Sequence, residues 1–257
     1  MDHKKHYVIC FCLSLVFCLA ILSQAKAETL NVTYSNFPPF TGGKLINGHV
    51  DDIGLMLEIY NAVLPKLGFS INYLQLPPAR IVKLMEDGTK VDLYLCGDHS
   101  LGKRPFYAFG PAFLSLSINL LQKTTLPVLD NPRTLQDTPI LKQQGFSGLK
   151  RLLDPSNKFI EVPTKSIAGV LVTRHINYVL GFKDRLEILF TSRKDIPSYR
   201  YYKLKEFKAH LCLNKRIPNA QQMVQKIHDA IVTFQDTPDG RSLFEKYEYK
   251  GRFGSID

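Results

Sequence analysis

The chain has 257 residues, 45% of them hydrophobic, and a formal net charge of +10. This length is sufficient for one large domain or two modest domains with apolar cores. The lysines and arginines are not clustered into a stripe with interleaved aromatic residues, which argues against a nucleic-acid-binding protein.

The first 27 residues are predicted to be a signal peptide. Lys4 and Lys5 come before an apolar run from Val8 to Leu22, and Ala25-Lys26-Ala27 then provides a small-residue cleavage site. The apolar run is long for a signal peptide but short for a membrane span, so an uncleaved anchor is the less favoured alternative. We therefore expect cleavage after Ala27 and a soluble exported protein.

Strands and helices alternate through the first part of the mature chain. Three segments alternate apolar and polar residues and are predicted to be strands: 29–34, 69–76 and 91–96. Between them, apolar residues at three- and four-residue spacing predict one helix that Asp51 and Asp52 open and Gly68 ends, and a second helix from Pro78 to Gly88. This order is typical of a parallel sheet with crossover helices.

A polar loop follows the predicted strand at 91–96. The strand breaks at Gly97, and Asp98, His99 and Arg104 follow before another apolar segment begins. Open α/β sheets bind small ligands at the carboxyl ends of their strands. The loop is therefore predicted to form half of a small-molecule binding site.

The rest of the chain has the same rhythm. Further strands are expected at 109–123, 140–144, 159–162, 176–180 and 208–214, and further helices at 149–153, 165–173, 220–234 and, after a turn at Asp239-Gly240, through Tyr247. A glycine turn from Gly145 to Gly148 precedes the helix at 149–153. Such a turn can bind an anion through its backbone amides, although many turns of this kind bind nothing.

The positive charge is concentrated in the middle of the chain. Residues 121–208 hold 16 Lys and Arg against 8 Asp and Glu, whereas the rest of the mature chain is near neutral. A basic segment could attract an anionic ligand, an anionic membrane surface or an acidic partner, or its charges could simply be solvated. The sequence leaves these interpretations open.

Four features occur together in this sequence. They are a signal peptide, the aromatic–proline loop Phe37-Pro38-Pro39-Phe40, the pair Gly48 and Asp52 at a helix start, and the strand VDLYLCG followed by an arginine-containing loop and Phe109-x-Pro111. Together they resemble the extracytoplasmic solute-binding proteins of the polar-amino-acid family (family 3), which are type II periplasmic binding proteins. The resemblance covers the mature chain and is strongest over residues 29–123.

The resemblance implies an α/β fold of two lobes. Each lobe would be a mostly parallel sheet flanked by helices, and two crossover strands would join the lobes. The first lobe would comprise residues 28–120 plus 209–257, and the basic second lobe residues 121–208. The ligand would bind between them.

Two cysteines remain once the signal peptide is removed, Cys96 and Cys212, and an oxidising compartment allows them to pair. In the fold of the family that the chain resembles, the strand at 208–214 returns beside the strand at 91–96. The resemblance therefore implies a disulfide between these two cysteines. Two buried free thiols are the alternative.

The same resemblance implies a set of ligand-binding residues. Arg104 stands where the family has its carboxylate-binding arginine, whose planar fork can hold a carboxylate through two hydrogen bonds. Phe37 and Phe40 match the aromatic wall that packs on the apolar part of the ligand. The full set is Phe37, Phe40, Gly97, Asp98, His99, Arg104, Gly145, Phe146, Ser147 and Phe182.

Two members of this set differ from the family. His99 replaces a hydroxyl-bearing residue, and its imidazole could make binding sensitive to pH. Phe182 stands where the family usually has an aspartate that pairs with the α-amine of the ligand. The ligand is therefore left open among an amino acid, an acidic or aromatic carboxylate and a peptide-like compound.

The function implied by this resemblance is a periplasmic binding protein that delivers a small carboxylate-bearing solute to an ABC-type importer by closure of its cleft. The alternatives are a ligand sensor that feeds a membrane signalling receptor, and an enzyme similar to the cyclohexadienyl dehydratases, with Asp52, Asp98 and Asp184 as candidate acids. The sequence has no nucleophile–histidine–acid set and no cysteine–histidine cluster at metal spacing, so no cofactor or metal is expected. The expected partners are the ligand and an inner-membrane permease or sensor, and the protein is expected to be a monomer.

Overall fold

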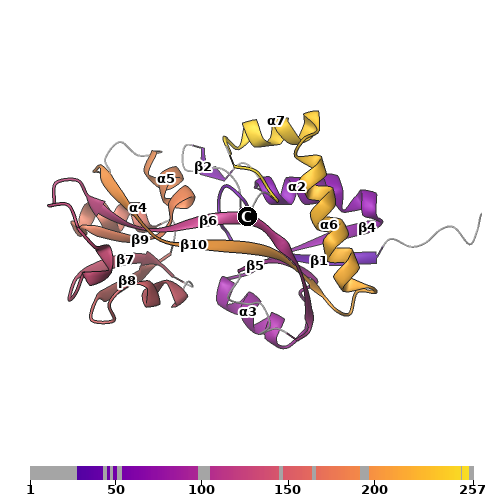
Figure 1. Cartoon of the computed structure of the whole chain (residues 1–257), viewed down its shortest axis with the longest axis horizontal. Coiled ribbons are helices and arrows are strands. Elements are labelled where there is room, and N and C mark those ends of the chain that lie inside the picture. The colour runs from indigo at the N-terminus through magenta and orange to yellow at the C-terminus, as the bar shows by residue number, and fades with distance from the viewer. Residues whose placement is uncertain are drawn as a thin grey trace, which may run out of the picture.

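The computed structural model describes residues 28–42, 45–46, 49–50, 54–97, 105–144, 147–163, 166–191, 197–249 and 251–254. The predicted signal peptide and the predicted helix opening at Asp51 and Asp52 lie outside these residues. Within the described part, one long sheet runs through the molecule, with helices gathered at its two ends (Figure 1). None of the described helices combines the length and the apolar character that a membrane crossing needs.

Eight described strands form this sheet, in the order β4-β1-β5-β10-β6-β9-β7-β8. Their bounds are β1 (Glu28–Tyr34), β4 (Phe69–Gln75), β5 (Leu93–Gly97), β6 (Tyr107–Lys123), β7 (Pro139–Gln143), β8 (Lys158–Val162), β9 (Tyr178–Phe182) and β10 (Tyr199–Asn214). β1, β4 and β5 run parallel, as do β7, β8 and β9, and antiparallel pairs join β5 to β10, β10 to β6 and β6 to β9. A separate short pair consists of β2 (Leu45–Ile46) and β3 (His49–Val50).

The long strands β6 and β10 connect the two ends of the molecule (Figure 1). The C-terminal part of β10 pairs with β5 at one end of the molecule. The C-terminal part of β6 pairs with β9 at the other end. We call the part around β1, β4 and β5 the first lobe and the part around β7, β8 and β9 the second lobe. This arrangement confirms the predicted fold class, although β10 begins at Tyr199 and is much longer than the strand predicted at 208–214.

The sheet of the first lobe is covered on both faces. α2 (Leu55–Val63) and α6 (Ala220–Phe234) pack on one face, with α7 (Pro238–Lys246) beside α2, and α3 (Pro78–Glu86) packs on the other face (Figure 1). Leu30 and Val32 of β1 contribute to the core on the α2 side. Ile81 and Met85 of α3 form a smaller cluster on the opposite side, so each face buries apolar side chains of its own.

The second lobe has a smaller core. α4 (Ile167–Thr173) and α5 (Lys183–Thr191) cover one face, where Leu141, Val179 and Leu186 are buried together. A 3-10 helix, Ser147–Leu152, contributes Leu149 to the other face, and a second 3-10 helix spans Pro132–Thr134. The helix predicted at 149–153 is therefore a 3-10 helix that begins at Ser147, and α5 has no counterpart among the predicted elements.

The first described residue of α2 is Leu55, and the helix start predicted at Asp51 and Asp52 lies outside the described residues. α2 begins at Leu55 after Gly54, which has a φ of 103° that side-chain-bearing residues rarely adopt. A Cβ on Gly54 would lie 2.7 Å from the carbonyl oxygen of Phe40, so glycine is required by space as well as by conformation. The acidic residue in the first turn is Glu58.

The other end of the chain contains a further correction. Asp239 and Gly240 lie inside α7 rather than in a turn before it. The hydroxyl of Thr237 accepts a hydrogen bond of 3.1 Å from the Gly240 amide, and Pro238 occupies the first helical position. The cap and the proline together explain why α7 starts earlier than predicted.

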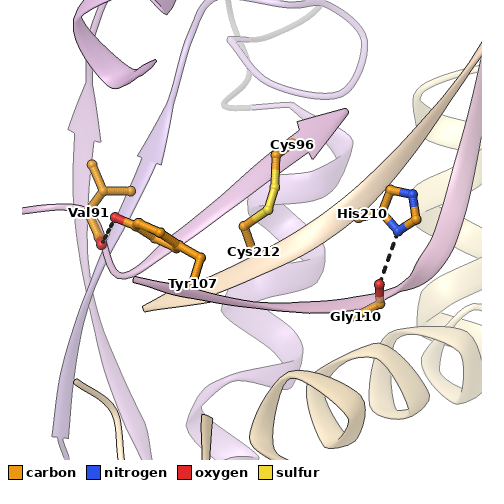
Figure 2. The surroundings of a disulfide bond; sticks show 6 residues. All are labelled: Val91, Cys96, Tyr107, Gly110, His210 and Cys212. Carbon is orange, nitrogen blue, oxygen red and sulfur yellow. Dashed lines mark hydrogen bonds between the residues drawn. A yellow bond between two sulfur atoms is a disulfide. The ribbon is translucent and has the colours of Figure 1, made fainter. Parts of the chain in front are cut away.

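A disulfide joins Cys96 to Cys212, as the family resemblance implied (Figure 2). In the antiparallel pairing of β5 with β10, Cys96 lies opposite His210, and Cys212 lies opposite Tyr94. The two cysteines are therefore diagonal neighbours on one face of the sheet, with Cα atoms 6.1 Å apart. Both pack beneath α3 in its apolar cluster.

Candidate ligand-binding cleft

A cavity of about 590 Å³ lies between the two lobes, a size typical of small-molecule sites. Three of its lining residues are at the carboxyl ends of strands: Tyr34 ends β1, Gly97 ends β5 and Phe182 ends β9. α2 and α3 line it from the first lobe, the 3-10 helix Ser147–Leu152 lines it from the second lobe, and β6 and β10 line it between them. The parallel strands of both lobes thus aim their ends at one space.

Four phenylalanines form a connected aromatic wall in this cavity. Phe37 and Phe40 stack with centroids 6.0 Å apart. Phe37 meets Phe182 edge to face at 5.1 Å, and Phe182 meets Phe207 of β10 in the same way at 5.5 Å. The wall therefore crosses from one lobe to the other, and aromatic surfaces of this kind pack well on apolar or planar ligand groups.

The loop that carries Phe37 and Phe40 is fixed by backbone hydrogen bonds. The Phe37 amide donates to the carbonyl of Thr41 at 2.7 Å, and the Thr41 hydroxyl donates to the carbonyl of Ser35 at 2.6 Å. The first two amides of α2, at Leu55 and Met56, donate to the carbonyls of Pro39 and Phe40 at 2.9 and 2.8 Å. The loop carbonyls thus accept hydrogen bonds from the first backbone amides of α2, which have no partner inside the helix. The same bonds fix the position of the loop.

Arg185 of α5 reaches from the second lobe to this loop. Its guanidinium donates a 2.7 Å hydrogen bond to the carbonyl of Asn36 and lies 5.1 Å from the centre of the Phe37 ring. The side chain is buried, and this burial lowers its pKa. Arg185 was missed in the sequence because α5 itself was not predicted.

Asp184, the neighbouring acid, is one of the candidate acids of the enzyme alternative. It is not among the described residues that line the cavity. Burial raises the pKa of Asp184, and the nearby Glu187 raises it further. Burial also raises the pKa of Tyr249, and the charge of Asp184 raises it further. Asp184 therefore lies in the first turn of α5, outside the described lining of the cleft.

The charged side chains among the described lining residues are exposed. They are Glu86 at the end of α3, Arg151 in the second lobe and Lys205 on β10. The buried part of the described lining consists of apolar, aromatic and hydroxyl-bearing side chains. Charge is therefore found at the rim of the described cleft.

The second lobe also buries a cation, and its ion-pair partner reaches the 3-10 helix that lines the cleft. Lys142 of β7 has a fully buried side chain and forms an ion pair of 3.3 Å with Glu161 on the adjacent strand β8. Lys150 approaches the same carboxylate at 2.7 Å. Burial lowers the pKa of Lys142, whereas the lysines hold the pKa of Glu161 below its usual range.

The predicted site residues fall into two groups. Phe37, Phe40, Gly97 and Phe182 all line the cavity, so the structure brings them together. Asp98, His99, Arg104, Gly145 and Phe146 lie outside the described residues, and of Ser147 only the backbone is described, at the start of a 3-10 helix. The candidate acids Asp52 and Asp98 of the enzyme alternative also lie outside.

Several cavity residues were missed in the sequence. Tyr60 lies in the helix predicted between Asp52 and Gly68 but was not proposed as a site residue, and Phe207 comes just before the strand predicted at 208–214. A four-residue spacing along α3, with Pro78, Val82 and Glu86 all lining the cavity, was a usable signal for the face of that helix. Among the described residues, no cluster of three potential metal ligands occurs.

No protein-family model and no curated protein matches this sequence. Similar solved structures include an ancestral arginine-binding protein bound to arginine, with 17% sequence identity and a TM-score of 0.67, covering 86% of this chain and 99% of that one. The GluR0 ligand-binding core with L-glutamate has 13% identity and a TM-score of 0.66, with 88% and 99% covered.

A third similar structure is the amino acid ABC transporter substrate-binding protein AbpA from Streptococcus pneumoniae bound to L-arginine. It has 14% identity and a TM-score of 0.66, with 87% of this chain and 95% of that chain covered. At such identities the likeness establishes the fold. The chain therefore has the two-lobe type II periplasmic-binding-protein fold.

Proposed function

We propose that this chain is a periplasmic binding protein for a small carboxylate-bearing solute and that it delivers the solute to an ABC-type importer. The observation that carries the proposal is the cavity of about 590 Å³ between the lobes, at which the carboxyl ends of β1, β5 and β9 meet. The shared fold with an amino acid ABC transporter substrate-binding protein supports it. The signal peptide would direct the mature protein to the periplasm. We propose that it acts there as a monomer.

In this proposal the lobes are residues 28–120 plus 209–257 and residues 121–208. Arg104 binds the carboxylate of the solute, and His99 and the Gly97 carbonyl make polar contacts beside it. The backbone amides of the turn at Gly145–Ser147 bind the anionic end of the solute from the second lobe. β6 and β10 are the two connections between the lobes, so they supply the hinge on which the cleft closes. Phe37 and Phe182, one from each lobe, meet edge to face across the closing cleft.

The second candidate is a ligand sensor that feeds a membrane signalling receptor. The fold is compatible with this alternative as well, because the GluR0 ligand-binding core also has it. Both candidates require the same solute-binding step, and they differ in the membrane partner. Co-purification of the tagged protein from membranes, with a permease or with a signalling receptor, distinguishes them.

Ligand binding is tested by a thermal-shift screen of the mature protein against amino acids, dicarboxylates, aromatic acids and small peptides. A solute present at about 100 times its dissociation constant adds about 2.7 kcal/mol to the free energy of unfolding and raises the melting temperature. The matched variants are Arg104→Ala and Arg104→Lys: both should weaken binding, because lysine cannot form the bidentate contact. If no compound raises the melting temperature, the proposed function is wrong.

A further inference from the structure

Arg185 of α5 connects the second lobe to the first lobe through two contacts. Its guanidinium donates a 2.7 Å hydrogen bond to the Asn36 carbonyl and lies over the Phe37 ring, 5.1 Å from the ring centre. Both partners belong to the loop that follows β1 in the first lobe. These contacts can therefore form only while the two lobes are close together.

The Phe37 ring has a second contact with the other lobe. Phe182, the last residue of β9, lies three positions before Arg185 and meets the ring edge to face at 5.1 Å. Phe37 itself is 9% exposed, so the ring is enclosed where the lobes meet. One aromatic ring of the first lobe thus contacts both β9 and α5 of the second lobe.

The first-lobe partners of Arg185 are held in a fixed position. The Phe37 amide donates to the Thr41 carbonyl at 2.7 Å, and the Leu55 amide of α2 donates to the Pro39 carbonyl at 2.9 Å. The loop is therefore bonded to itself and to the start of α2. A contact with this loop positions the first lobe as a whole rather than the loop alone.

The environment of Arg185 strengthens both contacts, because the residue is only 3% exposed. A charged donor forms a stronger hydrogen bond than a neutral one, and a cation over an aromatic ring gains more where water is excluded. Burial lowers the pKa of Arg185 to about 9, so the guanidinium stays charged at pH 7. The cost of burying this charge is limited, since a guanidinium is more weakly hydrated than an ammonium group.

We propose that Arg185 is a positioning residue that holds the two lobes together in the absence of solute, by binding the Asn36 carbonyl and the Phe37 ring. Opening of the cleft about β6 and β10 breaks both contacts and moves the guanidinium into water. Arg185 is not among the described residues that line the cavity, so it acts on the ratio of closed to open molecules and not on the solute. This inference takes its hinge from the proposed function and goes beyond that function, because it concerns the chain without solute.

The test measures the radius of gyration of the full mature protein, without solute, by small-angle X-ray scattering. The wild-type protein should fit the arrangement of the lobes in Figure 1. Arg185→Ala loses the hydrogen bond and the ring contact, so its ratio of open to closed molecules should rise about tenfold. Its radius of gyration should therefore exceed that of the wild-type protein.

Arg200→Ala is the matched control, because Arg200 forms contacts of the same kind inside the second lobe. Its guanidinium donates to the carbonyls of Leu126 and Thr124 at 2.7 and 2.8 Å. Arg200→Ala should lower the melting temperature and leave the radius of gyration unchanged. A loss of stability alone, without separation of the lobes, would give this result.

Arg185→Lys is a conservative second variant that decides the question if Arg185→Ala does not fold. Lysine keeps the charge and can donate a hydrogen bond, but it lacks the planar group that lies over the Phe37 ring. Its radius of gyration should lie above that of the wild-type protein and below that of Arg185→Ala.

Three results would overturn the inference: a wild-type protein that is already open without solute, wild-type radii in both Arg185 variants, or an increase in Arg200→Ala equal to that in Arg185→Ala. None of these measurements uses a solute. A failure here would therefore leave the proposed solute-binding function intact, whereas absence of binding across the thermal-shift screen would overturn that function alone.

Discussion

The two lobes have similar parallel strands but are stabilised in different ways. The first lobe has helices on both faces of its sheet, and the disulfide Cys96–Cys212 ties β5 to β10. The second lobe contains no cysteine, has a smaller apolar cluster and buries Lys142 against Glu161. The sheet continues through both, so the difference comes from what covers and crosslinks it.

This difference indicates a division of roles between the lobes. A covalent link and two apolar faces favour a rigid first lobe, on which the aromatic loop and the start of α2 are held. A buried ion pair adds less net stability, because removing two charges from water costs much of what their attraction returns. The second lobe is therefore expected to be the less stable of the two.

The largest expected effect comes from removing the crosslink. The double variant Cys96→Ser/Cys212→Ser should lower the free energy of unfolding by about 4 kcal/mol, because the disulfide closes a loop of 116 residues in the unfolded chain. Urea unfolding with and without reductant measures it. The double variant should be insensitive to reductant, and an unchanged wild-type midpoint in reductant would contradict the prediction.

A smaller effect is expected in the second lobe from the buried lysine. Glu161→Gln should cost about 2 kcal/mol, since it removes the carboxylate beside Lys142; the 32% exposure of Glu161 keeps the cost below that of a fully buried pair. Lys142→Met should be neutral or stabilising. Lys150→Gln, which removes only the exposed partner, is the control. Equal losses in Glu161→Gln and Lys150→Gln would show that Lys142 does not depend on Glu161.

The smallest effect concerns Asp184, in the first turn of α5. Its folded-state pKa is raised, so the folded protein binds a proton more tightly than the unfolded chain, and stability falls as pH rises from the ordinary aspartate pKa through the raised value. Asp184→Asn should therefore stabilise the protein at pH 7 by up to about 1 kcal/mol, with the gain vanishing in acid. Melting temperatures between pH 3.5 and 7 measure it.

Asp154 provides the control with the opposite sign. Hydrogen bonds from Ser156 and Gln136 hold its pKa below the ordinary value, so its contribution to stability is present at neutral pH and lost as pH falls. Asp154→Asn should therefore lower the melting temperature at pH 7. A matching response of Asp184→Asn and Asp154→Asn would refute the assignment of Asp184.

The strands of the sheet could largely be predicted, because alternation and turn residues mark their ends. Predictions failed where local pattern was weak. The first half of β10, from Tyr199, mixes lysine and tyrosine, and its pairing with β6 determines it as a strand. The start of α2 depends on contact between Gly54 and the carbonyl of Phe40, a contact that only the folded chain reveals.

The candidate site was predictable in part. Phe37, Phe40, Gly97 and Phe182 were found by the family resemblance and line the cavity. Arg185 and Tyr60 were not. Arg185 bonds to Asn36, 149 positions away, and Tyr60 lines the cavity although it lies among the apolar residues of α2. Residues whose place in the site comes from distant contacts leave no local signal.

The crosslink also has a consequence for the order in which the protein matures. Synthesis proceeds from the N terminus, so Cys96 is made 116 residues before Cys212, and β7, β8 and β9 all lie between them. β5 of the first lobe cannot pair with β10 until β10 has been synthesised, and by then the described strands of the second lobe have been made. Cys96 must therefore persist as a free thiol through that interval, which is the period when a wrong partner could capture it.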